Sequence, residues 1–328
     1  MKVIITGGAG FIGSHVVDAM VAQNAEVVVL DNFSTGREKN LEHVQGQIKL
    51  IECDLAIQGD WRGHFENTDW VIHLAALADI IPSIQKPEKY FCSNVDGTFN
   101  VLQAAQANKV KRFIYIASSS CYGIPDEYPT NENAEIRPQY PYALTKYLGE
   151  ELVMHWAQVY GFPALSLRFF NVYGPRSRTS GTYGAVFGVF LAQKLAGKPY
   201  TVVEDGTQTR DFTYVSDIVD SILAAADSDR TGKCYNVGSG ITVSVNRLVE
   251  LLGGEKVFIP KRPGEPDCTF ADISRIQSEL DWKPKVSIEV GVNKLLEHID
   301  YWRKAPVWDP ESIADATKDW FRYLGSGN

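Results

Sequence analysis

The sequence predicts an α/β fold built on a doubly wound parallel sheet, with a smaller lobe on its C-terminal side. Three observations predict it: short apolar runs alternate with helical patterns, a glycine-rich turn follows the first run, and an acid ends the second. Strands that alternate with helices form parallel sheets that are covered on both faces. Ligands of such sheets bind at the carboxyl ends of the strands, so the site is expected in the segments that follow the apolar runs.

The first apolar run, residues 3–5, leads into a glycine-rich turn. Its glycines fit two related spacings, G-x-G-x-x-G and G-x-x-G-x-x-G: Gly7, Gly8, Gly10 and Gly13. Such glycines allow a tight turn and a close approach of the backbone to a pyrophosphate, and the following helix N-terminus attracts the phosphates. Asp31 ends the second run, residues 27–31, about 20 residues later, where an acid can hydrogen-bond a ribose. Together these features predict a Rossmann-type dinucleotide site.

Further apolar runs and helical patterns complete the predicted architecture. The later runs are residues 48–51, 70–76, 112–117 and 165–170, and the long helical patterns span 87–108 and 142–160. Past residue 171, glycine and proline become frequent and the expected helices are short: 184–196, 216–226 and 243–251. These shifts predict a dinucleotide-binding domain at 1–171, a smaller lobe over most of 172–285 and a helical tail at 286–328.

The bulk composition argues against several classes of function. The 328 residues carry a net charge of −8, with 45% hydrophobic and 22% charged residues, which is typical of a globular protein. The chain has no Lys/Arg block, so nucleic acid and anionic membranes are not expected partners. No segment approaches the roughly 18 apolar residues of a membrane span, and no signal peptide is expected. The five cysteines include no C-x-x-C pair, which predicts a reduced, cytoplasmic protein without a metal site.

Tyr142 and Lys146 begin the helical pattern 142–160, four residues apart and therefore on one helix face. An ammonium beside a phenol favours the phenolate and lowers the pKa of the tyrosine from about 10. The phenolate could take a proton from a substrate hydroxyl while hydride leaves the same carbon. Ser118, at the end of the run 112–117, could share that hydrogen bond. Tyrosine–lysine pairs of this spacing are also common on protein surfaces, so the pair alone does not establish catalysis.

Several motifs that occur in order along the chain resemble those of a known family. They are the glycine turn, Asp31, residues 73–76, residues 94–98, the serines from Ser118, the pair Tyr142/Lys146 and residues 168–176. Together they resemble the extended short-chain dehydrogenase/reductases. Within that group the chain is most similar to the NAD-dependent sugar-nucleotide epimerases and dehydratases, and closest to UDP-glucose 4-epimerase. The resemblance reaches to about residue 284, and the tail beyond it matches no part of the family pattern.

The resemblance implies NAD as cofactor and a nucleotide sugar, expected to be UDP-linked, as substrate. It implies that Tyr142 is the catalytic base and acid, that Lys146 activates it and holds the nicotinamide ribose, and that Ser118 orients the C4 hydroxyl. The implied cofactor contacts are Gly7, Gly10, Phe11, Ile12, Gly13, Asp31, Asn32, Asp54, Leu55, Leu74, Ala75, Ala76, Asn94, Tyr142 and Lys146. The implied substrate contacts are Ser118, Ser119, Ser120, Asn171, Arg210, Arg262, Glu265 and Thr269. Asp54 could equally cap the next turn.

The positions after Ser118 narrow the expected reaction. Related 4,6-dehydratases carry acids there that act at C5 and C6 of the sugar, and related C5-epimerases place a cysteine at the second position. Here the two positions are Ser119 and Ser120. Cys121 comes one residue late and on a strand would face the opposite side, so we interpret it as a packing residue. We therefore expect C4 epimerisation, in which a transient 4-keto sugar rotates and accepts hydride on its other face. Asp31 favours NAD, because its carboxylate would repel the 2′-phosphate of NADP.

The sequence leaves alternatives open for the sugar and for the reaction. Thr269 stands where a tyrosine limits relatives to unsubstituted hexoses, so both a UDP-hexose and a UDP-N-acetylhexosamine are expected substrates. A 4,6-dehydratase with an unusual acid is the alternative enzyme, and a non-catalytic dinucleotide-binding protein is the less favoured alternative.

His73 has no acid partner at a telling spacing and is interpreted as structural. Helices over 88–108 and 142–160 pair across a two-fold axis in the family, which predicts a homodimer.

Overall fold

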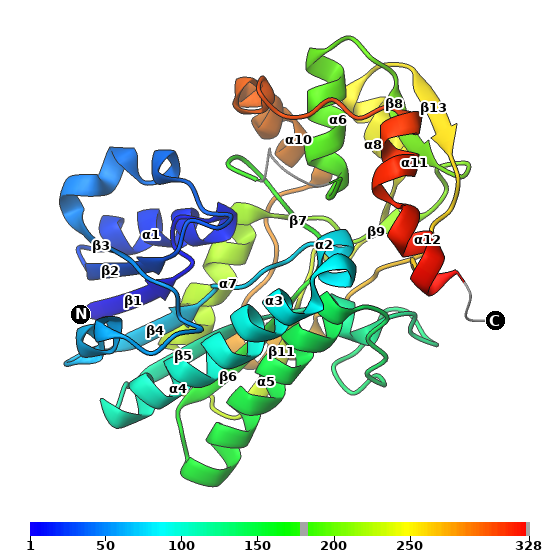
Figure 1. Cartoon of the computed structure of the whole chain (residues 1–328). Helices are drawn as coiled ribbons and strands as arrows, with labels where there is room; N and C mark the ends of the chain where they lie inside the picture. The colour runs from blue at the N-terminus through cyan, green and yellow to red at the C-terminus, as the bar shows by residue number, and fades with distance from the viewer. Residues whose placement is uncertain (178–182, 326–328) are drawn as a thin grey trace.

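In the computed structural model, which describes residues 1–177 and 183–325, a seven-stranded parallel sheet lies at the centre of the larger lobe (Figure 1). The strand order is β11-β6-β5-β4-β1-β2-β3. The strands are β1 (Lys2–Thr6), β2 (Glu26–Asp31), β3 (Ile48–Glu52), β4 (Trp70–His73), β5 (Arg112–Ser118), β6 (Ala164–Phe169) and β11 (Lys233–Val237). The predicted doubly wound fold is confirmed. The order reverses between β1 and β4, where crevices at the carboxyl edge of such sheets form.

Helices cover both faces of this sheet, and an apolar cluster lies between the sheet and the helices on each face. On one face, α1 (Phe11–Ala22) packs beside α7 (Val215–Asp227). On the other, α4 (Gly97–Ala107) and α5 (Pro141–Tyr160) lie side by side (Figure 1). Successive side chains of a strand point to opposite faces. The strands are therefore apolar on both faces, as in β1, where Ile5 joins the first layer and Ile4 the second.

The predicted helix at 87–108 is a continuous helical run with one irregular turn. It consists of α3 (Pro87–Phe91), a π-helical turn at Cys92–Asp96, and α4. A π turn widens the helix locally and often occurs near functional sites. Here it contains Asn94, whose side chain accepts from Leu77 N–H at 2.8 Å and donates to Thr145 Oγ1 at 3.0 Å. The turn therefore ties the loop after β4 to helix α5.

The smaller lobe and the tail share a separate apolar cluster above the carboxyl edge of the sheet (Figure 1). The strands of this lobe are β7 (Val172–Tyr173), β8 (Tyr200–Val203), β9 (Thr209–Arg210), β10 (Thr213–Tyr214), β12 (Val243–Ser244) and β13 (Lys256–Ile259). The remaining helices are α2 (Ile80–Gln85), α6 (Val186–Leu195), α8 (Val245–Leu252), α9 (Ser274–Leu280), α10 (Ile288–Glu297), α11 (Pro310–Ala316) and α12 (Lys318–Leu324). The predicted tail contains α10, α11 and α12, with a non-helical stretch at 303–309, and its residues 326–328 lie outside the described residues.

The predicted domain boundary at residue 171 does not separate the two lobes cleanly, because segments after it return to the larger lobe. The elements α7, β11 and α9 fall within 172–285 but pack with the sheet of the larger lobe. The chain therefore crosses between the lobes more than once after residue 171. In the described ranges, no helix has the length and apolarity to cross a bilayer. The same ranges hold no group of three or more His, Cys, Asp or Glu placed to bind a metal.

Candidate active site

A cavity of about 700 Å³ lies between the carboxyl edge of the sheet and the smaller lobe. Its wall brings together almost all of the residues that the sequence implicated, from the glycine turn at Gly7 to Thr269. Asn94 is different, because its buried side chain lies behind the wall and bonds to Leu77 and Thr145. Its role as a cofactor contact remains a prediction, and in the structure it fixes the wall.

The glycine turn is required by close contacts of the backbone. Gly7 has φ +67°, and its N–H donates to Leu30 O at 2.8 Å. A Cβ on Gly13 would lie 2.2 Å from Gly7 O, and a Cβ on Gly7 would lie 2.8 Å from the backbone of Ala75. Both contacts are far shorter than van der Waals distance, so a side chain at either position would displace β1, the turn or the loop after β4.

Helix α1 begins at this turn with its first N–H groups directed at the cavity. Gly10 is its N-cap, and among the described residues no side chain caps this end. The first turn also lacks an acidic residue, so the partial positive charge of the helix end is available to an anion. Gly10, Phe11 and Ile12 line the cavity beside Gly13. A backbone cradle with open N–H groups fits the pyrophosphate of a dinucleotide.

Asp31 ends β2 in the wall of the cavity and is held in one orientation by the backbone. Its carboxylate accepts from Ala9 N–H at 2.9 Å and from Phe33 N–H at 2.8 Å. Burial raises the pKa of Asp31, and these N–H bonds counteract it. Asp54 lies in the same wall and accepts from Ala56 N–H at 2.9 Å. Asp54 therefore caps the next turn, which is one of the two expected alternatives, and it also lines the cavity; its contact with a cofactor remains a prediction.

His73 lies behind the cavity wall at the end of β4. Its ring bonds to Thr6 Oγ1 at 2.7 Å and Thr98 Oγ1 at 3.0 Å. Burial lowers the pKa of His73 to about 3, and the nearby charge of Lys146 contributes. The interpretation of His73 as structural is confirmed by this burial and by its two threonine partners.

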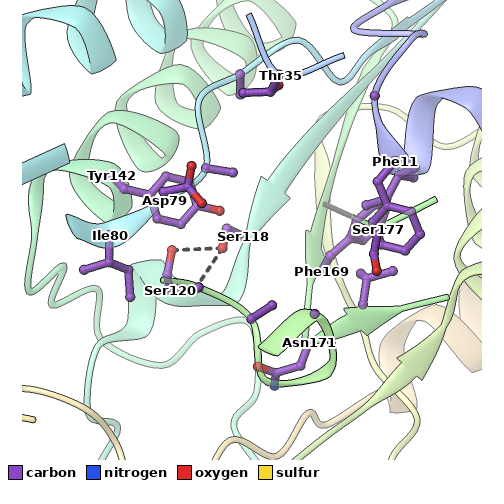
Figure 2. Close-up of a pocket in the computed structure, with 18 of the residues that line it drawn as sticks. Phe11, Thr35, Asp79, Ile80, Ser118, Ser120, Tyr142, Phe169, Asn171 and Ser177 are labelled. Atoms are coloured by element: carbon purple, nitrogen blue, oxygen red, sulfur yellow. Dashed lines mark hydrogen bonds between the residues drawn. The ribbon is translucent and has the colours of Figure 1, made fainter. Parts of the chain in front are cut away.

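The catalytic candidates come from two elements that converge on the cavity. Ser118 ends β5, while Tyr142 and Lys146 lie in the first turns of α5 (Figure 2). The Ser118 hydroxyl accepts from Ser120 Oγ at 2.9 Å and from Ser120 N at 3.2 Å. Burial raises the pKa of Tyr142, and hydrogen bonds with Ser118 and Ser120 act in the opposite direction. A hydroxyl pair therefore faces the phenol, as the predicted role of Ser118 requires.

Lys146 is buried next to an aromatic ring. Burial lowers its pKa to about 7, and Glu150 counteracts this. Its Nζ lies 4.3 Å from the centroid of the Tyr115 ring, a cation–π contact that stabilises the charged form. Its predicted action on the phenol of Tyr142 remains a prediction.

The segment after Ser118 is a 3₁₀ turn, Ser119–Tyr122, and not a continuation of β5. Ser119 and Ser120 line the cavity. Cys121 is buried in the apolar layer that contains α1, and burial raises the pKa of its thiol to about 12. The predicted packing role of Cys121 is confirmed. The reason given for it was wrong, because a helical turn and not strand alternation directs the side chain inward.

Two arginines and a carboxylate form the opposite end of the cavity. Arg262 donates to Glu265 through Nε at 2.7 Å and Nη2 at 3.0 Å, and Arg210 donates through Nη2 at 3.0 Å. Burial of Glu265 favours its protonated form, but the two guanidinium groups hold its pKa below the ordinary value. The cluster therefore keeps one net positive charge in a mostly buried place, which suits an anionic ligand.

Asn171 and Thr269 stand between the catalytic end and the arginine end. Asn171 Nδ2 donates to Thr269 Oγ1 at 2.7 Å and to Asp211 O at 3.2 Å. Thr269 Oγ1 also accepts from Asp211 N–H at 3.2 Å. Both side chains line the cavity. Their hydrogen bonds fix them in place, and the small side chain of Thr269 occupies the position where a tyrosine limits relatives to unsubstituted hexoses.

Several residues of the cavity wall are not among those predicted from the sequence. Asp79, in the segment between β4 and α2, lines the cavity that Tyr142 also lines (Figure 2). The others are aromatic residues from separate segments: Tyr140, Tyr183, Tyr301, Trp308 and Trp320. Three of these belong to the tail, which matches no part of the family pattern.

Comparison with known proteins was consistent with this geometry. A sequence profile of the NAD dependent epimerase/dehydratase family matches residues 3–238. A putative UDP-glucose 4-epimerase of Methanocaldococcus jannaschii is 33% identical over 305 residues, which cover 90% of this chain and 97% of the relative. The crystal structure of UDP-glucose 4-epimerase with UDP-glucose from Thermotoga maritima superposes with a TM-score of 0.86 at 32% identity, covering 93% of this chain and 99% of that one. The structure of UDP-glucuronic acid 4-epimerase from Bacillus cereus with UDP-glucuronic acid and NAD gives a TM-score of 0.84 at 32% identity, with coverage of 92% and 99%.

Proposed function

The chain belongs to the NAD-dependent epimerase/dehydratase family, and from that membership we propose that it inverts C4 of a UDP-linked hexose or N-acetylhexosamine. One observation supports this most strongly. The hydroxyl pair Ser118/Ser120 faces Tyr142 in the cavity that also contains the dinucleotide cradle and the Arg210–Glu265–Arg262 cluster. Cofactor, sugar and diphosphate can therefore be bound together.

The proposed chemistry assigns each of these residues a task. Bound NAD would accept hydride from C4 of the sugar and return it to the opposite face. Tyr142 takes the proton of the C4 hydroxyl as the keto group forms and gives it back when the alcohol is restored. Ser118 hydrogen-bonds the same oxygen and orients it. Arg210 and Arg262 bind the diphosphate, so that the sugar can rotate while the nucleotide stays fixed.

The serines after Ser118 favour epimerisation over elimination of water. A neutral hydroxyl is a weak base, so Ser119 and Ser120 cannot readily remove a C5 proton. Asp79 is the observation that favours the second candidate, a 4,6-dehydratase, because it adds a carboxylate to the wall of the cavity that Tyr142 also lines (Figure 2). The product mass separates the two, since a dehydratase product has lost one water.

The test is to incubate purified protein with UDP-glucose and with UDP-N-acetylglucosamine and to follow the anomeric protons by NMR. We expect conversion of at least one sugar to its C4 epimer without change in mass. Tyr142→Phe should lower the rate by about 10³-fold or more, because it removes the proton-transfer group. The proposal fails if neither sugar is inverted, or if Tyr142→Phe matches the wild type.

We also propose that the enzyme is a cytoplasmic homodimer. Large apolar side chains are exposed on the helices predicted to pair: Phe91, Phe99, Leu144, Val159 and Tyr160. Exposed apolar side chains gathered on neighbouring helices are typical of a subunit contact. All five cysteines lie in the described part of the chain and are free thiols, as a reducing compartment requires. Light scattering should give twice the mass of the chain, and a monomer would contradict the proposal.

A further inference from the structure

The tail contributes a buried aromatic side chain to the arginine end of the cavity. Trp320, on α12, is 4% exposed and lines the cavity. Its Nε1–H donates to Pro263 O at 2.7 Å, directly next to Arg262. The centre of the Arg262 guanidinium lies 5.2 Å from the centroid of the Trp320 ring. One side chain of the tail therefore contacts both the backbone and the charged group of the arginine loop.

Arg262 is held by rings as well as by its carboxylate partner. The Tyr183 ring also lies 5.2 Å from the guanidinium, and Glu265 accepts two hydrogen bonds from the same group. Each cation–π contact favours the charged, oriented arginine. A long side chain that is already ordered loses less conformational entropy when a ligand binds. The rings thus pre-organise Arg262 for an anion.

Trp320 is also connected to the catalytic end of the cavity. Its ring lies 6.3 Å from the Tyr140 ring, and Tyr140 stacks on Tyr142 at 6.3 Å with an interplanar angle of 9°. The helix that carries Trp320 packs against α2, where Gln85 Nε2 donates to Asp319 Oδ2 at 2.9 Å. Docking of α12 therefore fixes a row of aromatic rings between the arginine cluster and the catalytic tyrosine.

We propose that Trp320 is a positioning residue for the nucleotide diphosphate, acting through Arg262, so that the docked tail is part of the nucleotide site. The proposal rests on the proposed function and adds to it a residue beyond the segment that the family pattern covers. It predicts that loss of the indole weakens binding of UDP and leaves NAD, bound at the other end of the cavity, unaffected.

The experiment measures UDP binding by calorimetry, NAD binding by fluorescence, and thermal unfolding for each variant. Trp320→Ala should weaken UDP binding by about 10-fold, the range of a partly buried cation–π contact. Trp320→Phe keeps a ring but loses the bond to Pro263 O, so it should recover part of the affinity. Tyr323→Ala is the matched control, because this aromatic residue lies on the same helix with 58% exposure, and it should bind UDP like the wild type.

A double-mutant cycle separates positioning from general destabilisation. If Trp320 acts through Arg262, then Arg262→Ala and Arg262→Ala/Trp320→Ala should bind UDP equally weakly. Independent, additive losses would overturn the inference, as would an equal loss of NAD binding in Trp320→Ala or an unchanged affinity for UDP. Failure of the wild-type enzyme to bind UDP would instead contradict the proposed function. In steady-state kinetics, KM should rise more than kcat falls.

Discussion

The two ends of the cavity are built by different means. At the end proposed to bind the cofactor, called the cofactor end, the backbone forms the site: a glycine turn, the start of α1 and an aspartate held by two N–H groups. At the end proposed to bind the nucleotide, called the nucleotide end, side chains form it, with Arg210, Arg262 and Glu265 bonded together and enclosed by aromatic rings. The first lies within residues 7–33, whereas the second joins segments from residue 183 to residue 320. The ends should therefore respond separately to substitution.

The largest effect is expected at the cofactor end, from Gly13→Ala. The new Cβ would lie 2.2 Å from Gly7 O, a backbone atom that cannot move without moving the turn. We expect loss of NAD binding and a decrease of about 3 kcal/mol or more in the free energy of unfolding, at the upper end of what overpacking usually costs. Denaturant unfolding and NAD titration measure both.

Gly46→Ala is the matched control for Gly13→Ala. A Cβ at Gly46 meets no described atom within 4 Å, so this variant should unfold and bind NAD like the wild type. If Gly13→Ala also retains wild-type NAD affinity, the cofactor end is not determined by backbone contacts and the comparison of the two ends fails.

At the nucleotide end, Arg210→Ala should have a smaller and selective effect. It removes one charged donor from Glu265 while Arg262 remains paired. UDP affinity should fall by about 30-fold, which corresponds to about 2 kcal/mol for a charge-assisted contact. NAD affinity and stability should change little, as in the surface variant Arg247→Ala, whose partners are exposed glutamates. A matching decrease in NAD affinity would show that the two ends are not independent.

The smallest expected effect is the pH dependence of the free energy of unfolding that arises from His73, behind the cofactor end of the cavity. The pKa of His73 is lowered to about 3 in the folded protein, against about 6.5 in the unfolded chain. Between pH 6.5 and pH 3 the His73 imidazole is protonated in the unfolded chain but neutral in the folded protein. The free energy of unfolding therefore decreases as the pH falls from 6.5 toward 3. At pH 5.5 the loss should be about 1.4 kcal/mol.

A stability series from pH 7.5 to 5 measures this dependence for the wild type and for His73→Asn. The asparagine variant should have a lower stability throughout and a shallower slope over this range. Equal slopes would mean that His73 is not the group that titrates on unfolding.

The two ends also differ in how far the sequence alone predicts them. The glycine turn, Asp31 and the Tyr142/Lys146 pair follow from local spacing, because backbone sterics and helix periodicity act over a few residues. The tail contacts of Arg262 depend on packing between residues about 60 positions apart, and only the structure reveals them. The implied roles of Arg210, Arg262 and Glu265 came from family resemblance and not from the spacing of these residues.

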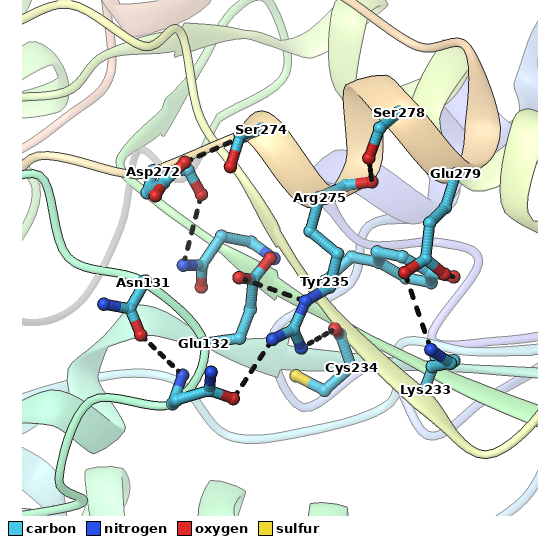
Figure 3. A network of polar contacts seen from close by, with 12 residues as sticks. Asn131, Glu132, Lys233, Cys234, Tyr235, Asp272, Ser274, Arg275, Ser278 and Glu279 are labelled. Carbon is cyan, nitrogen blue, oxygen red and sulfur yellow. Dashed lines mark hydrogen bonds and ion pairs between the residues drawn. The ribbon is translucent and has the colours of Figure 1, made fainter.

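Strand β11 shows the same limit within the fold. Its sequence, KCYNV, is only five residues long and has neither a continuous apolar run nor a regular alternation, so it is not among the predicted strands. The strand is stabilised by distant partners (Figure 3). Arg275 of α9 donates to Cys234 O at 3.3 Å, Tyr235 Oη donates to Glu279 at 2.8 Å, and Asn236 N–H donates to Glu132 at 2.9 Å. A strand whose partners lie elsewhere in the chain carries little local signal.

The most direct test of the proposed function follows a deuterium label at C4 of the sugar. UDP-glucose labelled at C4, or the N-acetylated analogue if that is the sugar inverted, would be incubated with the enzyme in ordinary water. Because the hydride leaves C4 and returns to C4 in the same cavity, the epimer should retain its deuterium, and a reaction in heavy water should add none to the sugar carbons. Loss of the C4 label, or deuterium from solvent at C5, would contradict C4 inversion and indicate chemistry at the neighbouring carbon.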